Sequence, residues 1–147
     1  MKRLLFSGDQ SVHSTSASWG LLVLRVGIGL TLMLGHGWGK LSGFDSMAAK
    51  FADPYGFGAT MSLALAVFAE FFCSLLIVTG TFTRLATIPL IITMLTAFFI
   101  IHGGDPFARK ELAFMYLVPF VTLLITGPGR FSIDYLLSGK REPVVES

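Results

Sequence analysis

The chain has 147 residues, of which 53% are hydrophobic and only 14% are charged, and its mean hydropathy is +0.72. A soluble domain usually carries about 25% charged residues, so the composition excludes an ordinary soluble domain and is typical of one membrane domain. The formal net charge of +2 comes from scattered basic residues, which argues against a nucleic-acid partner.

Four apolar stretches follow one another along the chain. Each is close to the 20 or so residues that cross a hydrocarbon core of about 30 Å. We expect spans at residues 19–39, 59–79, 85–101 and 112–126. The last is short, but Asp105 followed by Pro106 predicts an earlier helix start, with a capping side chain and an initial proline. The predicted fold is therefore an all-α integral membrane four-helix bundle, antiparallel, with up-down-up-down topology.

Glycine and proline residues divide these stretches. Gly80 and Gly127 are expected to end the second and fourth helices, because glycine readily adopts the left-handed conformation of a helix terminus. Pro89 and Pro119 are expected to bend the third and fourth helices without ending them.

Both ends of the chain are predicted to be flexible tails, at residues 1–18 and 138–147, around a membrane domain at 19–137. The first tail has no apolar region long enough for a cleavable signal peptide. With four spans, both termini lie on one side, and the larger number of Lys and Arg residues on that side favours the cytoplasm. We expect a multi-pass protein of a bacterial-type inner (plasma) membrane.

The first span carries two stripes at helical spacing. The charged stripe contains Arg25, Gly29, Leu32, His36 and Lys40. The second stripe contains small residues four apart, Gly27, Thr31, Gly35 and Gly39. Small residues let helix backbones approach closely in lipid, and we expect both faces to lie against protein.

Glu70 lies in the middle of the second span, where a charge costs roughly 2.5–3.5 kcal/mol on insertion scales. It should therefore be paired or protonated. Heights along antiparallel helices, at about 1.5 Å per residue, place Arg25 within reach, so we predict an Arg25–Glu70 ion pair. Such a pair either fixes helix register only or lines an internal site.

The opposite ends of the spans predict a polar rim. His36 and Lys40 end the first span, His102 ends the third, and Glu111 begins the fourth. The candidate ligand-binding residues are Arg25, His36, Lys40, Glu70, His102 and Glu111, and no catalytic residue is assigned. Two histidines could ligate haem b or a metal, but nothing in the spacing requires it, so we expect neither. A quinone ring that exchanges protons with histidine and glutamate is favoured.

The connection after the first span contains four aromatic residues among polar ones: Phe44, Phe51, Tyr55 and Phe57. Such a segment is typical of a membrane interface. It either anchors in the headgroups, which we favour, or covers the rim as a lid.

Three segments resemble the DoxX family of small membrane proteins: "LRVGIGLTLMLGHGWGKL", "AEFFCSLLIVTGTFTRLATIPL" and "GPGRFSIDYLL". The resemblance implies a four-helix membrane bundle associated with redox chemistry. Some members are subunits of thiosulfate:quinone or quinol oxidoreductases, others belong to oxidative-stress complexes, and many have no established activity. The matching motif positions are Arg25, His36, Lys40, Glu70, Arg84, Glu111, Arg130 and Asp134, with Gly35 and Gly39 as structural positions.

The leading functional hypothesis is a membrane subunit of a quinone-linked oxidoreductase or redox-stress system. Cys73 is the single cysteine, which argues against a dithiol mechanism within the chain, and we expect it to be a buried small residue. The alternative is a non-catalytic scaffold or carrier of a small lipophile, with structural charges; a weaker one is a proton-coupled transporter. The expected partners are the lipid bilayer, a redox subunit or a second copy of the chain.

Overall fold

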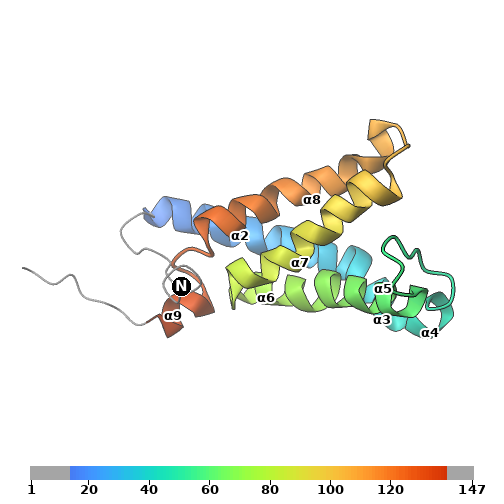
Figure 1. The fold of residues 1–147 in the computed structure, drawn as a ribbon. Coiled ribbons are helices and arrows are strands. Elements are labelled where there is room, and N and C mark those ends of the chain that lie inside the picture. Colours follow the sequence, from blue (N-terminus) through green and yellow to red (C-terminus); the bar gives the residue numbers. More distant parts are fainter. Residues whose placement is uncertain (1–13, 139–147) are drawn as a thin grey trace, which may run out of the picture.

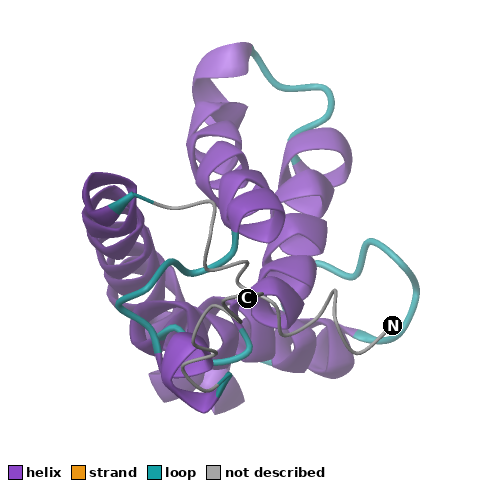
Figure 2. Ribbon diagram, turned by 90° about the vertical axis from the view of Figure 1, so that its left-hand side faces the viewer, coloured by secondary structure: helices purple, strands orange, loops and turns teal. Residues whose placement is uncertain are grey.

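The computed structural model describes residues 14–138, and in this part of the chain every regular element is a helix (Figure 1; Figure 2). Three continuous helices are long and apolar enough to cross a membrane: Thr15–Ser42, Ala59–Thr79 and Thr83–Ile101. A further long helix is α8 (Phe107–Thr126), which packs against α7 and α2. The all-helical prediction is thus confirmed for the described residues.

Each of the three membrane-crossing helices contains a π-helical turn. The first helix consists of α2 (Thr15–Leu32), η1 (Met33–Gly37) and α3 (Trp38–Ser42). The second consists of α5 (Ala59–Val67), η2 (Phe68–Cys73) and α6 (Ser74–Thr79). The third consists of α7 (Thr83–Thr96) and η3 (Ala97–Ile101). The short helices are α4 (Phe44–Met47) and α9 (Ile133–Leu137).

The predicted spans agree with these helices in position and differ at some ends. The second has the predicted bounds, whereas the first begins at Thr15, within the predicted tail, and the third begins at Thr83. Residues 1–13 and 139–147 of the two predicted tails lie outside the described residues. The fourth helix begins directly after Pro106, and Asp105 bonds to a neighbouring side chain instead of capping it.

The predicted helix breaks are confirmed. Gly80 ends α6 with φ of 70°, and Gly127 ends α8 with φ of 79°. Pro89 and Pro119 both lie inside continuous helices. The missing hydrogen bonds at these prolines are therefore tolerated within α7 and α8, as is common where neighbouring helices cover the backbone.

Arg25 joins α2 to two segments that are distant in the sequence. The side chain is fully enclosed, with 2% of the residue exposed. Its Nη1 donates to Val78 O at 3.0 Å and Ile77 O at 3.4 Å, and its Nη2 donates to Phe131 O. The last carbonyls of a helix lack a full set of helical donors, so the guanidinium satisfies polar groups that lipid could not. This clamp fixes α2 against the end of α6.

The predicted Arg25–Glu70 ion pair is wrong, because Glu70 pairs with Lys40 instead. The prediction aligned the start of the first span with the end of the second. In the structure these two ends are not level, because Arg25 lies beside Ile77 and Val78 at the end of α6, and Gly37 lies against the backbone of Glu70. Arg25 is about 12 residues from that level, or roughly 18 Å along the helix. The two charged groups therefore belong to different ends of the molecule.

Gly29 and Gly37 mark the close approach of the first two long helices. A Cβ on Gly29 would lie 3.1 Å from Ser74 O, and a Cβ on Gly37 would lie 2.6 Å from Glu70 O. Backbone atoms cannot move aside as a flexible side chain can. Glycine at these positions therefore allows the helices to approach closely.

The predicted small-residue stripe does not form this contact. Gly27, Gly35 and Gly39 are exposed, and a Cβ on any of them would have nothing within 4 Å. They lie about 200° around the helix from the stripe that contains Arg25, at 100° per residue. Within residues 14–138, the neighbouring helices cover the side of the first helix that carries Arg25. The opposite side, with the small-residue stripe, is left uncovered.

The segment after α8 caps the start of α7. The carboxylate of Asp134 accepts hydrogen bonds from Phe82 N at 2.7 Å and Thr83 N at 2.9 Å. These bonds satisfy donors at a helix start that have no partner within the helix. Ser132 caps α9 by accepting from Tyr135 N at 3.2 Å. Arg84 Nη2 donates to Ile125 O at 3.2 Å, which ties α7 to the end of α8. Arg130 lies in the same segment and is half-buried.

Replacement of Arg25 by Met should lower the free energy of unfolding by about 3 kcal/mol, because charge-assisted hydrogen bonds to otherwise unsatisfied carbonyls are lost. Thermal unfolding in detergent can be followed with a thiol-reactive fluorophore, since Cys73, the single cysteine, is 1% exposed. Arg109→Met is the matched control, because the side chain of Arg109 is 72% exposed. Equal melting temperatures for both variants would contradict the clamp.

Replacement of Gly37 by Ala should destabilise the protein strongly, by several kcal/mol, because the added methyl overlaps the backbone of Glu70. Gly35→Ala, on the open side of the same π-helical turn, should be neutral or slightly stabilising. The fluorophore assay described for Arg25 measures both variants. Similar effects at the two positions would show that the first two helices do not touch at Gly37.

Candidate functional site

A cavity of about 210 Å³ lies between the helices at the end opposite the Arg25 clamp. Its apolar wall includes Leu32, Met94, Ala97, Leu112 and Ala113. Its polar wall consists of His36, Lys40, Glu70, His102, Arg109 and Tyr116. We call it the polar cavity. All three membrane-crossing helices and α8 contribute to it, so it depends on how these elements pack.

The wall of the polar cavity contains an ion pair between the Lys40 ammonium and the Glu70 carboxylate. The two side chains are 18% and 8% exposed. Lys40 comes from α3 and Glu70 from η2, which the contact at Gly37 brings together. The pair removes the cost of an isolated charge in apolar surroundings and leaves polar atoms at the cavity wall.

Three π-helical turns surround the polar cavity. His36 lies in η1, Glu70 lies in η2, and Ala97 begins η3, which ends just before His102. A π-helical turn is rare and appears often at functional sites, because it changes the direction in which side chains leave the helix. Such turns have no simple residue pattern, so the sequence did not predict them.

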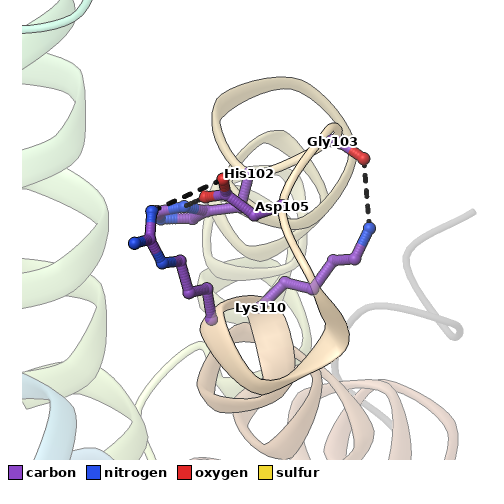
Figure 3. Close-up of polar contacts among 5 residues, drawn as sticks. His102, Gly103, Asp105 and Lys110 are labelled. Atoms are coloured by element: carbon purple, nitrogen blue, oxygen red, sulfur yellow. Dashed lines mark hydrogen bonds and ion pairs between the residues drawn. The ribbon is translucent and has the colours of Figure 1, made fainter.

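His102 is held by Asp105 at the rim of the polar cavity (Figure 3). Its Nδ1 lies 2.9 Å from Asp105 Oδ2, and Arg109 Nη1 lies 3.6 Å from Asp105 Oδ1. The Lys110 ammonium donates to Gly103 O at 3.2 Å and closes the connection (Figure 3). When Nδ1 donates to Asp105, the Nε2 atom of His102 remains an acceptor.

The pKa of Asp105 is held below its ordinary value, chiefly by the hydrogen bond to His102 and then by the positive charge of Arg109. The carboxylate is therefore the stable partner of the histidine ring at neutral pH. An aspartate in this position orients the imidazole ring of His102.

Tyr116 is a cavity residue that the sequence analysis missed. It is 4% exposed, and its ring meets the His36 ring edge-on, with centroids 5.9 Å apart. The sequence pattern could have identified it. The buried stripe of α8 contains Ala113, Tyr116, Phe120 and Leu123, and among these side chains only that of the tyrosine carries a polar atom. Arg109 also lines the polar cavity and was not among the predicted ligand-binding residues.

The structure brings together four of the six predicted ligand-binding residues: His36, Lys40, Glu70 and His102. Arg25 lies in the clamp at the other end, and Glu111 is exposed and does not line the polar cavity. Glu111 turns away because the inward side of α8 is the stripe of Ala113 and Tyr116. Within residues 14–138, no three His, Cys, Asp or Glu side chains are grouped so that they could hold a metal ion.

Replacement of Asp105 by Asn should lower the melting temperature at pH 7. Because the pKa of Asp105 is lowered in the folded protein, its stabilising effect is present above pH about 4 and is lost as the pH falls through the lowered pKa. The difference in melting temperature between wild type and variant should therefore shrink between pH 6 and pH 3. A difference that stays constant over this range would show that the carboxylate charge is not involved.

Apolar helices of membrane-crossing length around a polar cavity define a helical membrane protein. The chain belongs to the DoxX family, whose sequence profile matches residues 20–103, a range that includes His36, Lys40, Glu70 and His102. It is 35% identical over 126 residues to the inner membrane protein YqjF of Escherichia coli (strain K12), over 82% of this chain and 94% of that protein. No solved structure matches the chain. The resemblance seen in the sequence is confirmed.

Proposed function

We propose that this DoxX protein binds a quinone-like molecule inside the membrane and serves as the membrane subunit of a redox system. The observation that carries the proposal is the polar cavity, in which an ion pair and two histidines meet between apolar helices. Ionisable groups at such depth are costly, so they mark a functional site by default. The similarity to an inner membrane protein of Escherichia coli supports a location in the inner membrane.

The polar cavity offers the groups that a quinone ring needs. The Lys40 ammonium and the His36 ring can donate hydrogen bonds to the two carbonyl oxygens. Reduction of a quinone takes up two electrons and two protons. Glu70, His36 and His102 can hold and deliver protons at the quinone oxygens, and a partner subunit supplies the electrons.

We infer further that α8 crosses the membrane as a fourth span of an antiparallel bundle, with both termini in the cytoplasm. Its 20 residues are long enough, at about 1.5 Å per residue, to reach across the hydrocarbon core. Arg109, Lys110 and Glu111 lie near its start, where they can reach the headgroup region. The packing of α8 along α7 supports this arrangement.

A carrier of a small lipophile is the second candidate function. It is favoured by the role of Arg25, whose bonds to backbone carbonyls hold helices together and do not contribute to the cavity. A carrier would release its ligand with its redox state unchanged. A redox subunit would convert quinone to quinol when its electron-donating partner is present.

Glu70→Gln should abolish or weaken quinone binding by at least tenfold while the protein still inserts, because the ion pair and a proton-exchanging group are lost. The measurement is a titration of the purified protein in nanodiscs with a short-chain ubiquinone, together with quinone extraction from the native membrane. Melting temperature and membrane insertion are recorded for each variant.

The matched control is Glu111→Gln, the same chemical change at an exposed site outside the polar cavity. It should bind the quinone like the wild type. Normal binding by Glu70→Gln would reject the site. A wild-type protein without quinone, but with another bound lipophile, would favour the carrier.

A further inference from the structure

A second cavity, of about 430 Å³, is also lined by the Lys40–Glu70 pair. We call it the apolar cavity. Its side walls come from α5, with Leu65 and Ala66, and from α7, with Ile92. Phe51, Pro54, Tyr55 and Phe57 of the connection after α4 also line it.

The two cavities share four wall residues: Lys40, Glu70, Ala97 and His102. Three of these, Lys40, Glu70 and His102, carry polar side-chain atoms of the proposed quinone site. A molecule whose polar head contacts the ion pair therefore has an apolar space directly beside that head.

The roof of the apolar cavity is fastened on two sides. The Asp53 carboxylate accepts hydrogen bonds from Gly58 N at 2.8 Å and Ser62 Oγ at 2.7 Å, which ties the roof to α5. The Tyr55 hydroxyl lies 2.7 Å from Thr96 Oγ1, which ties it to α7. The aromatic connection thus covers a cavity, as in the lid interpretation of the sequence, and its tyrosine bonds to α7 although 51% of that residue is exposed.

The two cavities differ in volume, and the difference indicates which part of a ligand each can hold. Small-molecule sites usually measure about 300–1,000 Å³. The polar cavity, at about 210 Å³, is smaller than this range, whereas the apolar cavity, at about 430 Å³, falls inside it. A lipophile that places its head at Lys40 therefore needs further space, and the adjoining apolar cavity provides it.

We infer that the apolar cavity binds the hydrocarbon chain of the same molecule whose polar head occupies the polar cavity. The ligand class is thus an amphiphile with one polar ring or head and one alkyl or isoprenoid chain, held beneath the roof formed by residues 51–57. This inference rests on the proposed function and specifies its substrate class. Transfer of each methylene from water into an apolar site should tighten binding about fourfold.

The test compares two quinones with the same dimethoxy-methyl-benzoquinone ring, one without a chain and one with a decyl chain. Binding of each is measured to the full chain in nanodiscs of constant lipid composition, and the ratio of the two dissociation constants is the readout. In the wild type this ratio should greatly favour the decyl compound. Ala66→Phe, which fills the apolar cavity, should reduce the ratio at least tenfold, the effect of displacing about two methylenes.

Ala64→Phe is the matched control, since Ala64 lies on the same helix, is half-buried like Ala66 and lines neither cavity. It should leave the ratio unchanged, which removes simple partition of the chain into lipid as the explanation. If Ala66→Phe does not insert, Ala52→Phe narrows the same cavity from the roof.

The outcomes distinguish the two proposals. If the chainless quinone binds and Ala66→Phe leaves the ratio unchanged, the inference is overturned and the proposed function stands. If neither quinone binds the wild type, both are overturned. A phospholipid that co-purifies with the wild type and is lost from Ala66→Phe, with the quinone ratio unchanged, would assign the cavity to a membrane lipid and overturn the inference.

Discussion

The guanidinium of Arg25 sets the arrangement on which the rest of the molecule depends. It ties α2 to the final carbonyls of α6 and to the segment before α9. With that end fixed, the register of the first two long helices follows, and Gly37 meets the backbone of Glu70. The same register brings Lys40 to the Glu70 carboxylate. The buried charge of Arg25 at one end of the molecule thereby positions the Lys40–Glu70 ion pair at the other end.

The sequence allowed the helices to be predicted because apolar length, glycine stops and proline positions are local properties. It also identified most of the polar cavity, because each charged or histidine residue in an apolar stretch requires a polar partner. The partner of Glu70 was predicted wrongly because the ends of the first two long helices were taken to be level. In the structure α2 extends past the end of α6, and Arg25 meets the last carbonyls of that helix. Glu111 was predicted as a ligand-binding residue because of its position at the start of the fourth span. Packing, however, determines which side of α8 faces the cavity, and Glu111 lies on another side.

The two glycine stripes show why spacing alone does not identify a contact. Gly27, Gly35 and Gly39 have the spacing of a close-packing face and are exposed, whereas Gly29 and Gly37 form the contact. The deciding factor is the side of the helix on which Arg25 is buried. A buried charge, which lipid cannot solvate, determines the orientation of a helix more strongly than small residues do.

The three π-helical turns have a consequence for how related sequences vary. Each turn accommodates an additional residue relative to an α-helix and rotates everything that follows it by about 100°. Deletion of a single residue within η1 would leave an apolar helix that still inserts, yet it would turn Lys40 away from Glu70. Insertions and deletions inside these helices should therefore be more damaging to this protein than their hydropathy suggests. A relative whose sequence has a gap at η1, η2 or η3 should keep the helices and lose the geometry of the polar cavity.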